Sequence, residues 1–133
     1  MQTFTERTAK RDELLSQVFG RTPASGGRRP PRPSAEHLNV LIDVLFGEVW
    51  SRPGLEPKER SMCTVAALIA LNRQDELRAH LRGALNLGIS KDKLLEIILH
   101  MGFYAGAPTA NSAVQVERKS TKDAPALAGA SSR

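Results

Sequence analysis

Apolar residues recur at intervals of three and four along most of this 133-residue chain, and this spacing constrains the fold more than any other feature. The segment 38–50 shows it most clearly, because its apolar residues are Leu38, Leu41, Ile42, Leu45, Phe46 and Val49. Such spacing gathers apolar side chains on one face of an α-helix, whereas a strand requires an alternation with period two, which no segment shows. We therefore predict an all-α protein.

Capping residues and helix breakers divide the chain into about six helices. Ser34 and Ser90 are suited to cap helix N-termini, Pro57 suits a first helical position, and Gly88 suits a helix end. We expect a short helix from Thr5 to Gly20 and further helices over about 34–50, 57–71, 73–87, 91–105 and 108–119. The predicted organisation is an N-terminal helix with a Pro/Arg/Gly-rich linker (1–33), a helical domain (34–119) and a disordered tail (120–133).

Two of these helices, 58–71 and 91–105, are more apolar than a small monomer can easily hide. The first contains the uncharged run Met62–Leu71, which must be covered on every side. We therefore expect an obligate homo-oligomer.

The formal charge of +5 lies almost wholly at the two ends of the chain. Residues 1–33 hold seven Lys/Arg against three Asp/Glu, residues 34–118 hold nine against ten, and residues 119–133 hold three against one. The middle is neutral and its few aromatic residues do not alternate with basic ones, so we expect no nucleic acid partner. With no apolar leader and no run long enough to span a bilayer, we expect a cytoplasmic protein without membrane contact.

The three histidines supply few candidates for acid–base chemistry. His80 follows Glu76 by four residues, so on a helix the carboxylate could orient the imidazole and raise its pKa. The alternative is an ordinary surface pair that contributes a few tenths of a kcal/mol. His100 and Tyr104 repeat the spacing, and there packing is the stronger alternative.

Arginines beside the Pro53-Gly54 turn are candidates for holding an acidic substrate. Arg52 and Arg60 flank this turn, and a guanidinium grips a carboxylate through two parallel donors, although a purely structural role is equally compatible with the composition. The spacing of His, Cys and acidic residues predicts no metal site. Cys63, the single cysteine, stands inside the apolar run and is predicted to be a small core residue.

Taken together, these motifs resemble the carboxymuconolactone decarboxylase family over residues 38–118. The resemblance is carried by Phe46-Gly47-Glu48-Val49-Trp50-Ser51-Arg52-Pro53-Gly54-Leu55, Arg60-Ser61, Glu76-Leu77-Arg78-Ala79-His80 with Ala84 and Gly88, and Tyr104-Ala105-Gly106-Ala107-Pro108 with Ala110-Asn111. It implies the all-α fold of the alkyl hydroperoxidase D superfamily and a ring-shaped trimer or hexamer. The peroxidase branch of that superfamily is disfavoured, because its two cysteines would fall at Arg73 and Glu76 and its relay glutamate at Ser61.

The resemblance implies a cofactor-independent decarboxylase of an unsaturated lactone acid from aromatic-acid breakdown. His80 is then the acid, Glu76 its orienting partner and Glu48 a second proton-transfer group. Arg52 and Arg60 would bind the anion, and Trp50 and Tyr104 would line the pocket. Two alternatives stay open, namely isomerisation, lactone opening or cyclisation in a specialised pathway, and a non-catalytic oligomeric binding protein.

Overall fold

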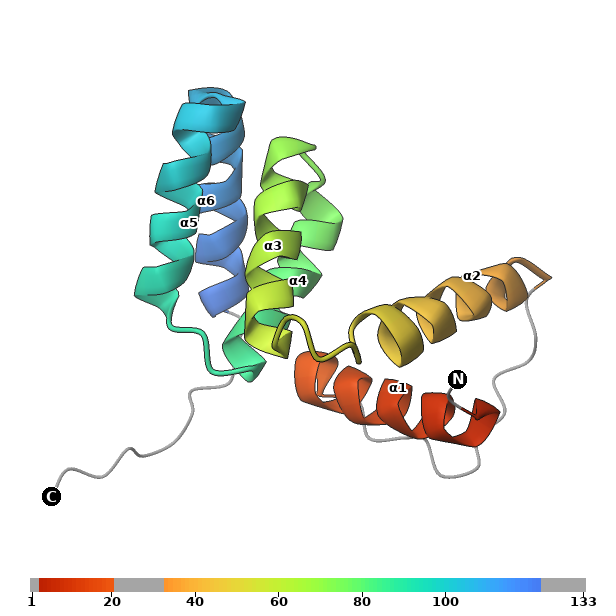
Figure 1. The fold of residues 1–133 in the computed structure, drawn as a ribbon. Helices are drawn as coiled ribbons and strands as arrows, with labels where there is room; N and C mark the ends of the chain where they lie inside the picture. The colour runs from red at the N-terminus through yellow and green to blue at the C-terminus, as the bar shows by residue number, and fades with distance from the viewer. Residues whose placement is uncertain (1–2, 21–32, 123–133) are drawn as a thin grey trace, which may run out of the picture.

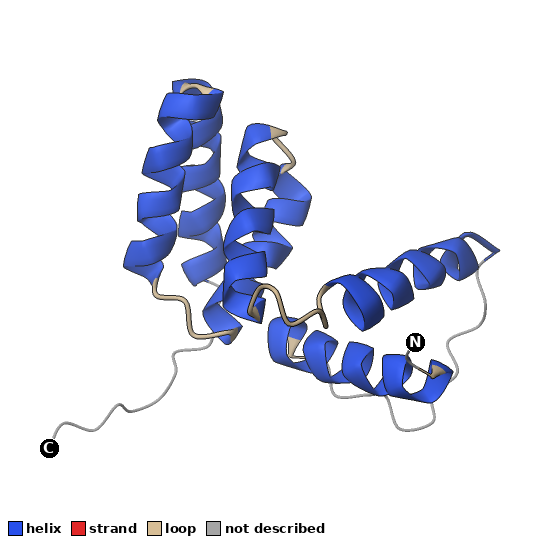
Figure 2. Cartoon of the chain, viewed as in Figure 1, coloured by secondary structure: helices blue, strands red, loops and turns tan. Residues whose placement is uncertain are grey.

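Four helices stand side by side as a bundle, and two N-terminal helices lie across one end of it (Figure 1). The structure is a computed structural model that describes residues 3–20 and 33–122, with only the backbone described at 33–36 and 121–122. The elements are α1 (Phe4–Phe19), α2 (Pro33–Val44), the π-helical turn η1 (Leu45–Val49), α3 (Pro57–Ala70), α4 (Gln74–Asn86), α5 (Lys91–Ala105) and α6 (Ala107–Lys122). Every regular element in the described ranges is a helix, which confirms the all-α prediction (Figure 2).

Local signals account for most helix ends. Ser90 caps α5 by accepting a hydrogen bond from the amide of Lys93. Gly88 and Gly106 follow α4 and α5 with φ of 84° and 99°, a region that glycine enters without strain. Asn72, in the tight α3–α4 turn, also has a positive φ, of 53°.

The structure differs from the sequence predictions at three helix boundaries. Helix α1 begins at Phe4, one residue before the predicted start at Thr5, because Thr3 caps it and forms a reciprocal capping box with Glu6. Helix α2 begins at Pro33, so Ser34 lies inside it. At the other end α6 continues to Lys122, and Ser120 is buried there. Apart from Gly20, Pro33 and 120–122, the predicted linker 20–33 and tail 120–133 lie outside the described residues.

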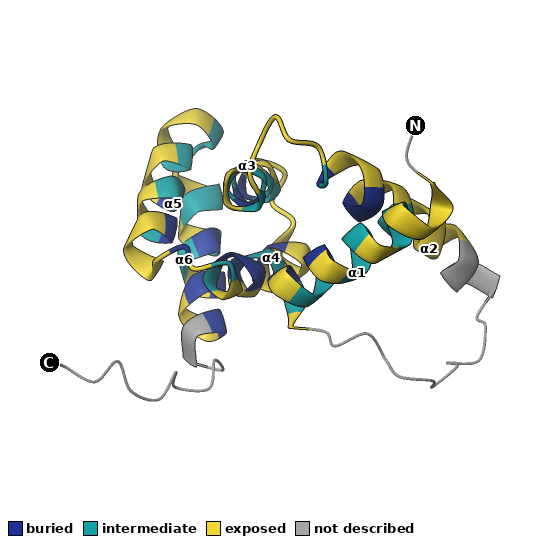
Figure 3. Ribbon diagram, turned by 60° about the horizontal axis from the view of Figure 1, so that its bottom comes forward, coloured by how far each residue is buried: buried dark blue, intermediate teal, exposed yellow. Residues whose placement is uncertain are grey.

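The apolar side chains form two clusters. Figure 3 colours the residues by burial and shows buried positions both in the bundle and in α1. The larger fills the bundle α3–α6 and includes Val65, Ile69, Leu81, Leu94 and Ile98. The smaller joins α1 to the α2–η1 segment and consists of Leu14, Val18, Phe46 and Trp50, with partly buried residues around it. Helix α1 is therefore packed on two sides, since it also contacts α4.

Helices α3 and α5 are not covered on every side in this chain. Cys63 is exposed, so the prediction that it is a core residue is wrong: its side of α3 lies along an open groove rather than inside the bundle. Leu99, Phe103 and Tyr104 on α5 are exposed as well. In the described ranges, no helix combines the length and the apolar character needed to cross a membrane.

Candidate active site

A π-helical turn precedes the residues predicted to bind substrate. In η1 the amide of Trp50 donates to the carbonyl of Leu45 at 2.8 Å, a span of five residues. Such turns are rare and are frequent at functional sites. Here the turn leaves Phe46, Gly47 and Trp50 buried while Glu48 is exposed. The π turn thus directs Glu48, the predicted proton-transfer residue, toward solvent, while Phe46 and Trp50 on either side of Glu48 point into the protein.

Glu48 is held by a residue of α1. Its Oε1 atom lies 2.9 Å from Nη1 of Arg7. The stem of Arg7 runs directly over Gly47, where an added Cβ would come within 2.6 Å of Arg7 Cγ. Nε of Arg7 is buried without a hydrogen-bond partner. The glycine before Glu48 therefore provides the space that brings α1 close enough to form this ion pair.

Trp50 and Arg52 share a cavity of about 320 Å³ between α1 and the turn that leads into α3. Trp50 is 5% exposed, and the other walls include Lys10 and Gln17 from α1. Nη2 of Arg60 donates to the carbonyl of Arg52 at 3.1 Å, which fixes the turn to α3. Arg60 is half-buried, and its Nε atom has no hydrogen-bond partner. The predicted pair of arginines is therefore close in space.

His80 projects from α4 against the end of α1. Its ring meets Phe19 edge to face, with centroids 5.5 Å apart at 76°, and its Nδ1 atom is buried without a hydrogen-bond partner. Burial lowers the pKa of His80 below its ordinary value of 6.5, and the Glu76 carboxylate opposes this shift without reversing it. We expected Glu76 to raise the pKa of His80, but the net shift is downward. The reason is that Glu76 is exposed whereas the imidazole is half-buried.

A chain of aromatic rings connects His80 with the cavity at Trp50. From His80 the contacts run through Phe19 to Phe46 at 5.9 Å and from Phe46 to Trp50 at 5.1 Å. Phe19 and Phe46 thus link the ring of His80 to that of Trp50. The structure joins the predicted residues through packing and does not gather them in one hydrogen-bonded cluster.

Tyr104 stands apart from the other predicted site residues. It is 77% exposed on α5 and stacks on His100, with ring centroids 4.7 Å apart. His100 lines a groove of about 470 Å³ between α3 and α5, which also contains Cys63. In Figure 1 the α1–α2 pair lies on the other side of α3 and α4 from α5. The single chain therefore does not bring Tyr104 to Trp50 or Arg52.

Sequence reasoning missed Arg7 and Phe19, the α1 residues that contact Glu48 and His80. Their amphipathic spacing with Leu14 and Val18 marked a packed helix without indicating its partners. The available signal was Gly47, since a glycine directly before a candidate acid permits close approach of another segment. In the ranges that the structure describes, no group of three or more His, Cys, Asp or Glu side chains could hold a metal ion.

Comparisons with known proteins agree with these motifs. The family model described as "Carboxymuconolactone decarboxylase family" matches residues 35–118. A 4-carboxymuconolactone decarboxylase of Acinetobacter baylyi is 49% identical over 85 residues, which cover 64% of this chain and 63% of that protein. A nitrosuccinic acid decarboxylase of Metarhizium robertsii is 31% identical over 120 residues, or 90% of this chain and 82% of that protein. The chain thus spans less than two thirds of the Acinetobacter protein's length.

Proposed function

This chain belongs to the carboxymuconolactone decarboxylase family, and from that premise we propose that it removes CO₂ from a small acid by acid–base chemistry of its own side chains. The substrate class is an acid whose carboxylate lies next to an electron-accepting group. The relatives named for 4-carboxymuconolactone and nitrosuccinic acid support this class, since a conjugated lactone carbonyl and a nitro group both accept the electrons that CO₂ leaves behind.

The observation that carries the proposal is that two candidate site residues on the packed helices α3 and α4 each hold a buried polar atom without a hydrogen-bond partner. These atoms are Nε of Arg60 and Nδ1 of His80, and Oγ of Ser61 on α3 is a third such atom. Buried donors and acceptors in native proteins are normally satisfied, so such atoms are available for a bound polar ligand. A guanidinium and an imidazole are the groups that an acidic substrate requires, the first for a carboxylate and the second for proton transfer.

The proposed reaction breaks the bond between the carboxylate carbon and the substrate. The electron pair of that bond passes into the lactone carbonyl or nitro group, CO₂ leaves, and a proton then adds to carbon. Burial lowers the pKa of His80 and so favours its neutral imidazole before substrate binds. The charge of a bound carboxylate favours the imidazolium, so substrate binding loads His80 with the proton that it later donates. Arg52 and Arg60 hold the carboxylate that remains, water returns a proton to His80, and Glu48 is a second proton-transfer group beside the N-terminal half of α1.

The test is CO₂ release from 4-carboxymuconolactone and from nitrosuccinic acid by the purified protein. We expect turnover of at least one, and a loss of roughly 100-fold or more in kcat for His80→Gln. His37→Gln is the matched control, because His37 is exposed on α2. Equal activity of the His80→Gln and His37→Gln variants would remove His80 from its role, and absence of CO₂ release from both acids would overturn the proposed reaction.

We further propose that the working form is a homo-oligomer, a trimer or hexamer. Support comes from Phe103, which is 86% exposed, and from Leu99 and Tyr104 beside it on α5. Contiguous exposed apolar residues mark interaction surfaces. Light scattering on the purified protein should give a multiple of the 14.5 kDa chain, and Phe103→Glu should lower it. A monomeric wild-type protein would contradict this proposal.

A further inference from the structure

Helix α1 lies outside residues 35–118, which the family model matches, yet it contacts both candidate proton-transfer residues. Near its start Arg7 pairs with Glu48, and at its end Phe19 packs on His80. Twelve residues separate the two contacts, a distance of about 18 Å along a helix axis. One rigid element therefore reaches two separate parts of the candidate site.

The C-terminal end of α1 is fixed to α4 beside His80. Val18 is fully buried against Gly83, where an added Cβ would come within 2.5 Å of Val18 Cγ1. Nδ2 of Asn86 donates to the carbonyl of Val18 at 2.8 Å. These two contacts leave little freedom to the next residue, Phe19, whose ring meets the imidazole edge to face. Phe19 thus restricts the orientation of His80 without occupying its ring nitrogens.

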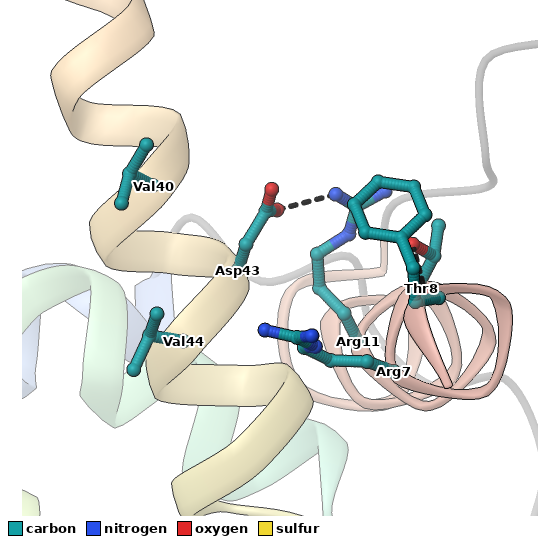
Figure 4. A pocket seen from close by; sticks show the side chains of 7 residues that line it. Arg7, Thr8, Arg11, Val40, Asp43 and Val44 are labelled. Atoms are coloured by element: carbon teal, nitrogen blue, oxygen red, sulfur yellow. Dashed lines mark hydrogen bonds and ion pairs between the residues drawn. The ribbon is translucent and has the colours of Figure 1, made fainter. Parts of the chain in front are cut away.

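The N-terminal half of α1 is held to the α2–η1 segment by two arginines. Arg7 pairs with Glu48, and Arg11 pairs with Asp43 and Asp12. Figure 4 shows the two side chains running from α1 toward α2, with Arg11 directed at Asp43. Both are partly exposed ion pairs between the same two segments. Only the Arg7 pair includes a candidate site residue, so the two pairs can be compared directly.

We propose that α1 is a working part of the active site, in which Phe19 positions the imidazole of His80 and Arg7 positions the carboxylate of Glu48. This inference rests on the proposed function, because it assigns positioning residues to that site. Neither residue transfers a proton itself. Phe19 fixes the direction in which the imidazole faces, and Arg7 fixes one oxygen of Glu48 while leaving the other available to accept a hydrogen bond.

The Phe19 contact is tested by comparing Phe19→Ala with Val18→Ala. Both variants loosen the packing of α1 on α4, but only Phe19→Ala removes the ring from His80. We expect Phe19→Ala to weaken the NOEs from the imidazole protons of His80 to neighbouring α4 protons, which report the direction of the ring, at least twice as much as Val18→Ala does. At a temperature where both variants are folded, kcat should fall roughly tenfold or more for Phe19→Ala while KM changes less, since misoriented catalytic groups act on kcat.

The Arg7 contact is tested by comparing Arg7→Gln with Arg11→Gln. Arg7→Gln removes one ion pair and Arg11→Gln removes two, so the Arg11 variant should lose at least as much stability as the Arg7 variant. We expect kcat to fall only for Arg7→Gln, and Arg7→Lys, which keeps a charge beside Glu48, to restore part of it. Equal loss for the two glutamine variants would show that Arg7 acts by holding the fold, and would overturn its positioning role.

The spectroscopic and kinetic results separate this inference from the proposed function. If the NOEs of His80 weaken no more in Phe19→Ala than in Val18→Ala, the role of Phe19 is overturned, whatever the activity. If the wild-type protein releases no CO₂ while Phe19→Ala still weakens the NOEs of His80, the proposed reaction fails and the positioning of His80 by α1 stands. Weakened NOEs with unchanged kcat in an active enzyme also overturn the inference.

Discussion

Substituting Gly83 by alanine should destabilise the protein, against the ordinary preference of helices. Gly83 lies inside α4, where replacing glycine by alanine normally adds about 1 kcal/mol to the free energy of unfolding. Here the new Cβ would lie 2.5 Å from Cγ1 of Val18 and 3.2 Å from its carbonyl oxygen. Val18 is fully buried and β-branched, so its side chain cannot turn to another rotamer to make room for the new methyl group. Helix α1 must therefore move away from α4.

The expected loss follows from these two opposing effects. Overpacking of this kind costs about 1–3 kcal/mol, so Gly83→Ala should lower the free energy of unfolding by about 1 kcal/mol after the gain in helix propensity. Val18→Ala removes two buried methyl groups and should itself cost about 2 kcal/mol. With Val18 already truncated, Gly83→Ala should be neutral or stabilising. The two substitutions should therefore be coupled by about 1–2 kcal/mol.

Urea unfolding of the wild type, both single variants and the double variant, followed by circular dichroism at one protein concentration, measures this coupling. The matched concentration matters because self-association would shift the apparent stability. Additive effects would refute the reasoning, since they would mean that Gly83 and Val18 do not meet. A stabilising Gly83→Ala in the wild-type background would refute it as well.

Three further predictions concern single residues. Because burial lowers the pKa of His80 below 6.5, the unfolded chain binds a proton at His80 more readily than the folded protein does, so the urea midpoint of unfolding should fall as the pH drops below about 6.5. The His80→Gln variant should lose part of this acid sensitivity. Identical pH profiles of the midpoint for the wild type and the variant would contradict the assignment. Trp50 is the single tryptophan, so its fluorescence should change when an acidic ligand enters the cavity that it lines. Arg52→Ala should weaken the binding of this ligand roughly tenfold. Equal affinities of the wild type and the variant would show that Arg52 does not bind the ligand. Thr3→Ala should cost about 1 kcal/mol in urea unfolding, and no loss would mean that the capping box of α1 contributes nothing.

The fold was largely predictable because its boundaries are encoded locally. Ser90, Gly88 and Gly106 each act through their own backbone and near neighbours, and apart from the C-terminal end of α6 the helices begin and end at or next to the predicted positions. The apolar spacing gave the face of each bundle helix for the same reason. Such signals need no knowledge of the tertiary partner.

The arrangement of the site was less predictable, because it depends on contacts between distant segments. Helical spacing placed Glu76 one turn before His80, but the burial that outweighs the carboxylate depends on tertiary packing, to which Phe19 contributes. The ion pair of Arg7 with Glu48 joins residues 41 positions apart. Cys63 was assigned to the core because its neighbours are apolar, although the structure leaves its side of α3 open. Periodicity specifies a face and does not identify its partner.

The π turn also restricts the length of the chain near the candidate site. A π turn holds one residue more than the α-helix around it, so deleting a residue within Leu45–Val49 would restore regular α geometry and leave the segments on either side nearly in place. The change would fall inside the turn, where Gly47 lies under the stem of Arg7 and Glu48 pairs with its guanidinium. With one residue fewer, these two positions could not both keep their places opposite Arg7. Homologues that share this ion pair should therefore keep the same number of residues within the turn.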